Sequence, residues 1–82
     1  MNRNEMFSVL KSNIETIVEV AEGKEIKETD NIVYDLGADS LEVVAVILRT
    51  QKQLKIEIPP AKLSQIEKIK DLLDLFEKTT SY

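Results

Sequence analysis

The chain has 82 residues, enough for one small folded domain, and we expect that domain to span residues 1–82. Its net charge at pH 7 is −4, which argues against nucleic acid as a partner because such binding depends on clustered lysine and arginine. The sequence contains no cysteine and no histidine, so disulfides, thiolate nucleophiles and the usual general base of hydrolases are excluded. The chain is therefore not expected to be an enzyme.

Charged and apolar residues are unevenly distributed along the chain. Residues 1–42 hold ten acids and four bases, whereas residues 43–82 hold five acids and seven bases. This polarity favours steered docking on charged proteins, although an ordinary solvated surface fits it equally well. No apolar run approaches the roughly 20 residues that cross a bilayer. We therefore expect a cytoplasmic monomer without a membrane partner.

The first predicted element is an amphipathic helix over about residues 3–22. Apolar residues recur there at spacings of three and four, as one buried helix face requires: Met6, Leu10, Ile14, Ile17, Val18 and Ala21. Asn2, with Glu5 three residues later, can cap the start of this helix. Gly23 can adopt the left-handed conformation that ends it.

A long loop follows from Lys24 to Ala38, where the helical periodicity stops. Scattered apolar side chains are expected to tie it to the core, namely Ile26, Ile32, Val33, Tyr34 and Leu36. Loops longer than about 12 residues are uncommon in small domains unless they have a function.

The second main helix is predicted from Ser40 to about Leu54. Asp39 and Glu42 form a variant of the capping box directly before a strongly apolar run. Pro59 and Pro60 then prevent the helix from continuing. A short helical turn can occupy residues 60–63, because proline is tolerated in a first helical turn.

The last predicted helix runs to about Lys78, with residues 79–82 frayed. Ser64 and Glu67 repeat the capping pattern, which predicts that this helix starts directly after Ser64. Its buried stripe is expected to be Ile66, Ile69, Leu72, Leu73 and Phe76. The alternating segment Ile56–Ile58 has no second strand to pair with, so a sheet is not expected. The predicted fold class is therefore all-α, a bundle of three main helices and a short fourth with a long first loop.

Several aspartates could be considered as an acid–base or metal cluster: Asp30, Asp35 and Asp39. Neither the spacing of a calcium-binding EF-hand nor a glycine-rich phosphate loop accompanies them. Loop solvation and helix capping explain these carboxylates better, and we expect no metal site.

Ser40 is the candidate functional residue, because it follows a glycine, a small residue and a capping aspartate at a helix start. Its hydroxyl should be exposed there, and a phosphodiester at this point would meet the positive end of the helix dipole. By spacing alone, a serine in this position is more typical of an ordinary helix start.

Residues 35–41, Asp-Leu-Gly-Ala-Asp-Ser-Leu, resemble the signature of acyl carrier proteins, and the similarity extends through residues 56–59, Ile-Glu-Ile-Pro. The resemblance implies that a phosphopantetheinyl transferase attaches a 4′-phosphopantetheine arm, taken from coenzyme A, to Ser40. The thiol of that arm would hold an acyl group as a thioester. Asp39 and Leu41 flank the implied attachment site.

The second helix presents an unexpected apolar side. At about 100° per residue, Val43, Val46, Ile47, Thr50 and Leu54 share one face, and Leu41, Ala45, Leu48 and Lys52 lie opposite. Either the long loop and first helix bury this second side, or it awaits a partner. The resemblance implies docking of the transferase, an acyltransferase, a ketosynthase or related synthases, and the predicted interface is Leu41, Glu42, Ala45, Leu48, Arg49 and Lys52.

The same helix departs from the resembled family, because fatty-acid carriers typically line it with acids that meet basic enzymes. Here Glu42 is its one acid. We therefore favour polyketide or similar specialised metabolism, with fatty-acid synthesis as the alternative. An aminoacyl or peptidyl carrier, a non-covalent adaptor and a small carboxylate hydrolase are the further alternatives.

A carried acyl chain could lie between the helices. The candidate lining residues are aliphatic, and ordinary core packing explains them equally well: Val33, Leu36, Val44, Ile47, Ile58, Ile66 and Ile69.

Overall fold

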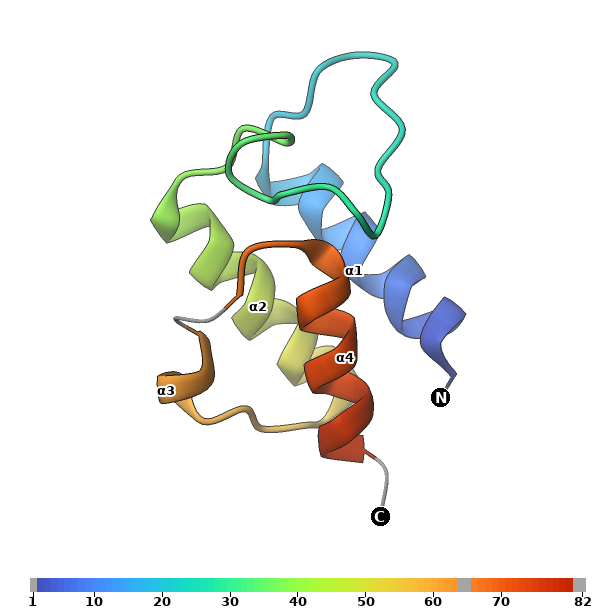
Figure 1. The fold of residues 1–82 in the computed structure, drawn as a ribbon, viewed down its shortest axis with the longest axis vertical. Helices are drawn as coiled ribbons and strands as arrows, with labels where there is room; N and C mark the ends of the chain where they lie inside the picture. Colours follow the sequence, from blue (N-terminus) through green and yellow to red (C-terminus); the bar gives the residue numbers. More distant parts are fainter. Residues whose placement is uncertain (1, 64–65, 81–82) are drawn as a thin grey trace.

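The structure, a computed structural model, describes residues 2–63 and 66–80. Its described part contains four helices in chain order, α1 (Arg3–Ile17), α2 (Ser40–Leu54), α3 (Pro60–Leu63) and α4 (Ile69–Thr80), and no strand (Figure 1). The predicted all-α bundle of three main helices and a short fourth is therefore confirmed. Within these ranges, no helix combines the length and the apolar character that a membrane span needs.

Helix α1 begins as predicted but ends earlier. The Asn2 side chain accepts a hydrogen bond from the backbone N–H of Glu5 at 2.9 Å, which caps the helix. The helix ends at Ile17 rather than near residue 22, because Val18 adopts an extended conformation with φ −98° and ψ 134°. β-Branched residues have low helix propensity, and Val18 is buried in its extended form. Gly23, with φ +82°, lies in a later turn instead of ending the helix.

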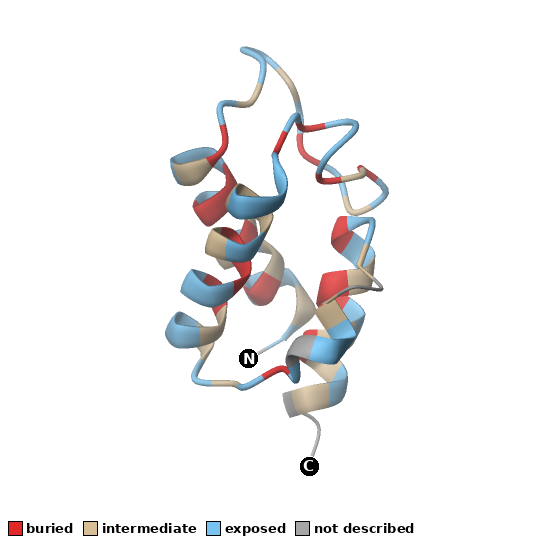
Figure 2. Ribbon diagram, turned by 90° about the vertical axis from the view of Figure 1, so that its left-hand side faces the viewer, coloured by how far each residue is buried: buried red, intermediate tan, exposed pale blue. Residues whose placement is uncertain are grey.

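The core lies where α1 packs against α2 and α4. Figure 2 shows the buried residues on the sides of the helices that face one another. Eight large apolar side chains of these three helices are almost completely inaccessible to solvent: Met6, Leu10, Ile14, Ile47, Ile69, Leu72, Leu73 and Phe76. Burying such a side chain stabilises the folded state by about 1.5–3 kcal/mol, so this contact fixes which side of α2 remains outside.

The long loop, residues 18–39, covers one end of the bundle and is tied to the start of α4 (Figure 1). An isolated antiparallel bridge joins Asn31 to Lys68. Around it, the N–H of Ile32 donates to the carbonyl of Glu67 at 3.1 Å, and the N–H of Ile69 donates to that of Asp30 at 3.1 Å. The loop is thus held by backbone hydrogen bonds as well as by side chains.

Three of the five predicted loop anchors are buried, namely Ile26, Ile32 and Leu36. The prediction was wrong for Val33 and Tyr34, which are 44% and 87% exposed. Their backbone N–H groups both donate to the Asn31 side-chain oxygen at 2.9 Å. This local turn directs the two side chains outward, an effect that hydrophobicity alone does not reveal.

The predicted short helix α3 is confirmed, but α4 differs from its prediction at both ends. It starts at Ile69, and just before it the Asp71 side chain accepts hydrogen bonds from the backbone N–H groups of Glu67 at 3.2 Å and Lys68 at 2.9 Å. Ser64 lies outside the described residues. The helix continues to Thr80, so Thr79 is helical rather than frayed, whereas residues 81–82 also lie outside the described part.

Candidate functional site

Ser40 is exposed and is the first residue of α2, as predicted. The Asp39 carboxylate accepts a hydrogen bond from the N–H of Glu42 at 2.8 Å, and the Glu42 carboxylate accepts one from the N–H of Asp39 at 3.0 Å. This is a complete capping box, and both predicted ends of α2 are confirmed. The acidic residues therefore fix the helix tip on which the serine lies.

The chain leading to Ser40 alternates between the core and the solvent. Leu36 and Ala38 are each 3% exposed, while Asp39 and Ser40 are exposed. Gly37 between the two buried residues has φ +81°, a left-handed conformation that other residues rarely adopt. The N–H of Ala38 donates to the carbonyl of Ile32 at 3.2 Å, which anchors the backbone two residues before the serine.

Asn31 is a site-supporting residue that the sequence analysis missed. Besides binding the N–H groups of Val33 and Tyr34, it donates its own N–H to the Asp35 carboxylate at 2.7 Å. The loop sequence contains a signal for these turns, namely Asn31 followed by Asp35. Asparagine and aspartate side chains commonly form hydrogen bonds to nearby backbone in tight turns. The loop before Ser40 is thus a set of short, side-chain-bonded turns.

The three aspartates first considered as a metal cluster each have a local structural contact. Asp30 accepts the N–H of Lys27 at 2.8 Å and pairs with Lys24 at 3.1 Å, and the backbone bond holds the pKa of its carboxyl below its usual range. Asp35 and Asp39 bind backbone N–H groups as described. In residues 2–63 and 66–80, no group of three suitable side chains could hold a metal ion.

The outer face of α2 is open. Leu41 is 81% exposed, Leu48 is 57% exposed and Val44 is 44% exposed, and Lys52 is exposed as well. Ala45 and Glu42 are half-buried. The alternative that the loop and α1 bury this side of the helix is therefore wrong.

The remaining predicted interface residue, Arg49, also contacts the bundle. It is exposed, yet its Nε donates to the Asn13 side-chain oxygen of α1 at 3.0 Å. The Asn13 amide nitrogen donates to Thr50 Oγ1 and to Gln53 Oε1, both at 2.8 Å. Since Asn13 and Thr50 are buried, these bonds fix the register of α2 on α1.

A cavity of about 270 Å³ lies beside the first turn of α2. It is lined by Asn31, Ile32, Val33, Tyr34, Val43, Ile66 and Glu67. Among the residues considered for acyl-chain contact, Val33 and Ile66 line this space. Leu36, Ile47, Ile58 and Ile69 are buried in the core and Val44 is exposed.

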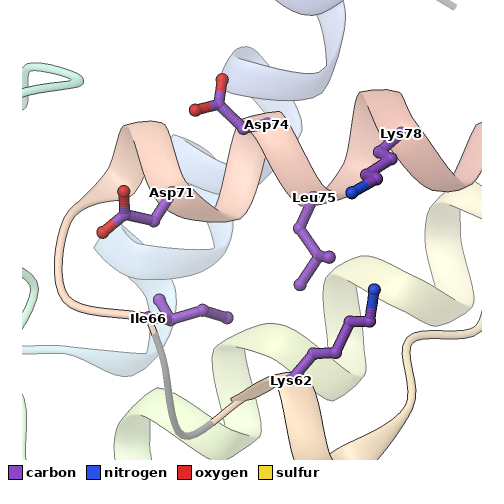
Figure 3. A pocket seen from close by; sticks show the side chains of 6 residues that line it. All are labelled: Lys62, Ile66, Asp71, Asp74, Leu75 and Lys78. Atoms are coloured by element: carbon purple, nitrogen blue, oxygen red, sulfur yellow. The ribbon is translucent and has the colours of Figure 1, made fainter.

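A second cavity, of about 280 Å³, lies between α3 and α4 (Figure 3). Lys62 and Lys78 extend toward the same space beside Leu75, while Asp74 points away. Asp74 instead binds Arg3 at 2.8 Å. No α2 residue lines this cavity, so it is separate from the surroundings of Ser40.

Comparison with known proteins identifies the family. Residues 8–76 match the family described as "Phosphopantetheine attachment site". The acyl carrier protein of Coprothermobacter proteolyticus is 34% identical over 77 residues, which cover 94% of this chain and 93% of the relative. That of Thermotoga maritima is 31% identical over 77 residues, 94% of each chain. The chain belongs to the acyl carrier protein family.

Acyl carrier proteins are carriers rather than catalysts, so this chain is not an enzyme and the hydrolase alternative falls away. Its prosthetic group is a covalently attached 4′-phosphopantetheine. The family works with transferase and synthase enzymes.

Proposed function

We propose that Ser40 carries the 4′-phosphopantetheine arm, within a single carrier domain that spans residues 1–82. The observation that carries the proposal is the exposure of Ser40 at the first position of α2, two residues after the buried Ala38. A transferase could reach this hydroxyl without opening the core. The arm's thiol would then hold the acyl group as a thioester.

The residues around Ser40 fit a phosphodiester. The helix N-terminus offers a favourable field to a negative charge. Asp39 caps the helix and keeps the serine at its tip, and the exposed Leu41 offers an apolar contact beside the modified residue. The cavity lined by Val43, about one helical turn after Ser40, offers about 270 Å³ of space near the start of the helix.

The test is coexpression with a phosphopantetheinyl transferase, followed by intact mass spectrometry. Wild type should gain the mass of the arm, and Ser40→Ala should not. Ser8→Ala, which alters an exposed serine of α1, is the matched control and should be modified like wild type. A wild-type chain left unmodified by several transferases, yet still bound to a synthase, would instead support the non-covalent adaptor.

We further propose that the carrier serves polyketide or similar specialised assembly, in the cytoplasm and as a monomer whose α2 face stays open to enzymes. The charges of α2 support this role: between Ser40 and Lys55 there is one acid, Glu42, against three bases. Fatty-acid synthesis is the second candidate, supported by the likeness over 94% of the chain to bacterial proteins named simply acyl carrier protein. An aminoacyl or peptidyl cargo is a further alternative.

Intact mass spectrometry of the protein purified from its own host distinguishes these roles, because it reports the arm and its cargo together. The specialised role predicts acyl groups that retain more than one keto group or are otherwise not simple saturated chains. A series of saturated acyl groups that differ by two-carbon steps would support fatty-acid synthesis, and an aminoacyl mass would support the remaining alternative.

A further inference from the structure

All the large apolar side chains that the described residues leave exposed are within eight residues of Ser40 in the sequence. They come from the end of the long loop and from the first three turns of α2, and we call them the apolar patch: Val33, Tyr34, Leu41, Val44 and Leu48. Isolated exposed apolar residues are ordinary on a protein surface, but here they gather on one side of α2 and on the loop segment that lines a cavity with Val43 of this helix. Such a patch is typical of a surface that a partner covers.

The charges at the two ends of this patch have opposite signs. Residues 35–42, which surround Ser40, contain three acids and no base. A phosphodiester on the serine would add to this negative charge. Residues 43–56 contain no acid and three bases, Arg49, Lys52 and Lys55, all of them exposed.

Two of these three bases, Lys52 and Lys55, are available to a partner, whereas Arg49 also donates a hydrogen bond to Asn13. The ion pairs found among the described residues involve Arg3 and Lys24, so Lys52 and Lys55 are in none of them. At about 1.5 Å per residue, Ser40 and Lys55 are roughly 22 Å apart along the helix. This is more than two Debye lengths at physiological ionic strength, about 8 Å each, so a partner meets the two ends as separate charges.

We propose that the partner of α2 is an arm-dependent synthase with a docking rim of two signs. Its rim is basic where it faces Asp39 and Glu42 and acidic where it faces Lys52 and Lys55. Between the basic and the acidic part of the rim, the enzyme has an apolar pocket that takes up Leu48. Tyr34 packs at the edge of that pocket. The inference rests on the proposed function, because the enzyme has to reach an arm on Ser40.

Lys52 lies in the last turn of α2, where a positive charge stabilises the helix by interacting with its dipole. This is a purely structural reason for a base at that position. That reason does not explain why Leu41 and Leu48 remain exposed on the same face. It also predicts a different outcome on mutation, because a dipole contribution changes stability and leaves the choice of partner unchanged.

The experiment uses the full chain, carrying on Ser40 an arm that ends in an electrophile, and one ketosynthase as the probe. The ketosynthase is made in two versions, with lysines or with glutamates at the rim opposite the distal half of α2. Wild type should crosslink about tenfold faster to the glutamate version at low salt, with the difference shrinking at high salt. The Lys52→Glu/Lys55→Glu variant should reverse this preference.

Two further variants make the result specific. Lys68→Glu/Lys70→Glu changes the net charge equally at exposed positions near the start of α4 and should keep the wild-type preference. Lys52→Gln/Lys55→Gln is neutral and should fall between wild type and the glutamate variant. Circular dichroism on each variant confirms that the bundle is folded.

The outcomes separate the inference from the proposed function. A chain that takes up no arm overturns both. A fully loaded wild type that crosslinks equally fast to both ketosynthase versions, or faster to the lysine version, overturns the two-signed rim while the carrier function stands. The two-signed rim is also overturned if the Lys68→Glu/Lys70→Glu control loses the preference for the glutamate ketosynthase as fully as Lys52→Glu/Lys55→Glu does. Net charge alone would then explain the preference.

Discussion

Replacing Asp39 tests whether the helix cap or the charge of this residue holds Ser40 in place. Asp39→Ala removes the acceptor that lies 2.8 Å from the N–H of Glu42. Asp39→Asn removes the charge but keeps a side-chain oxygen that can accept the same bond. The two substitutions therefore separate the two roles at one position.

The expected magnitudes follow from the capping geometry. Loss of an N-cap side chain costs about 1 kcal/mol, which lowers the melting temperature of a domain of this size by about 4–8 °C. Asparagine caps a helix about as well as aspartate, so Asp39→Asn should lose little beyond its interaction with the helix dipole, about 0.3–1 kcal/mol at most. Because Asp39 is exposed, salt should reduce this smaller loss further.

Thermal unfolding followed by far-UV circular dichroism measures the stability of both variants. The rate of arm attachment at limiting transferase then measures how well Ser40 is presented. Asp39→Ala should lower both quantities more than Asp39→Asn. Equal losses of melting temperature in the two variants would refute the capping argument, and normal stability with slow attachment in both would show that the transferase reads the charge itself.

Two other predictions concern stability. Thr50→Val should cost about 1–3 kcal/mol in urea unfolding, because it leaves an N–H of the buried Asn13 amide without its acceptor at 2.8 Å. Asn13→Leu/Thr50→Val should be more stable than Thr50→Val alone, because it removes both partners of the buried hydrogen bond. A double variant whose free energy of unfolding falls by the sum of the two single losses would contradict this. Lowering the pH should also destabilise the fold, because hydrogen bonds from backbone N–H groups hold the carboxyl pKa values of Asp71 and Asp30 below their usual range. Their contribution is present above about pH 4 and is lost as the pH falls through the lowered pKa values, so urea midpoints should drop on acidification and Asp71→Asn should flatten that drop.

The parts of the fold that the sequence predicted correctly are those set by local chemistry. Helix α2 has its predicted bounds because local features set both ends: the Asp39–Glu42 box starts it, and Lys55, in a left-handed conformation with φ +57°, ends it. The end of α1 and the start of α4 were wrong because distant contacts decide them. Val18 is buried in an extended conformation, and the segment before Ile69 bonds to the backbone of the long loop.

The candidate site shows the same division. The exposure of Ser40 followed from its position at a helix start, whereas the helix period placed Leu48 opposite the buried face without deciding whether the loop and α1 cover it. The outward direction of Tyr34 did not, because the Asn31 turn sets it and a loop has no period from which a face can be read. The bond from Arg49 to Asn13 joins residues 36 positions apart, a pairing that no local pattern indicates.

The charge arrangement of α2 links stability to the choice of partner. Acids near the N-terminus and bases near the C-terminus are the placement that a helix dipole favours, each by about 0.3–1 kcal/mol. A helix lined with acids throughout would place some of them at its C-terminal end, where the dipole opposes them. Asp39 and Glu42 at one end and Lys52 at the other therefore let this helix offer both signs of charge to an enzyme without weakening its own fold. Selection for a partner with an acidic rim would thus meet no opposition from helix stability at Lys52, whereas a change of Asp39 would also disturb the cap that positions Ser40.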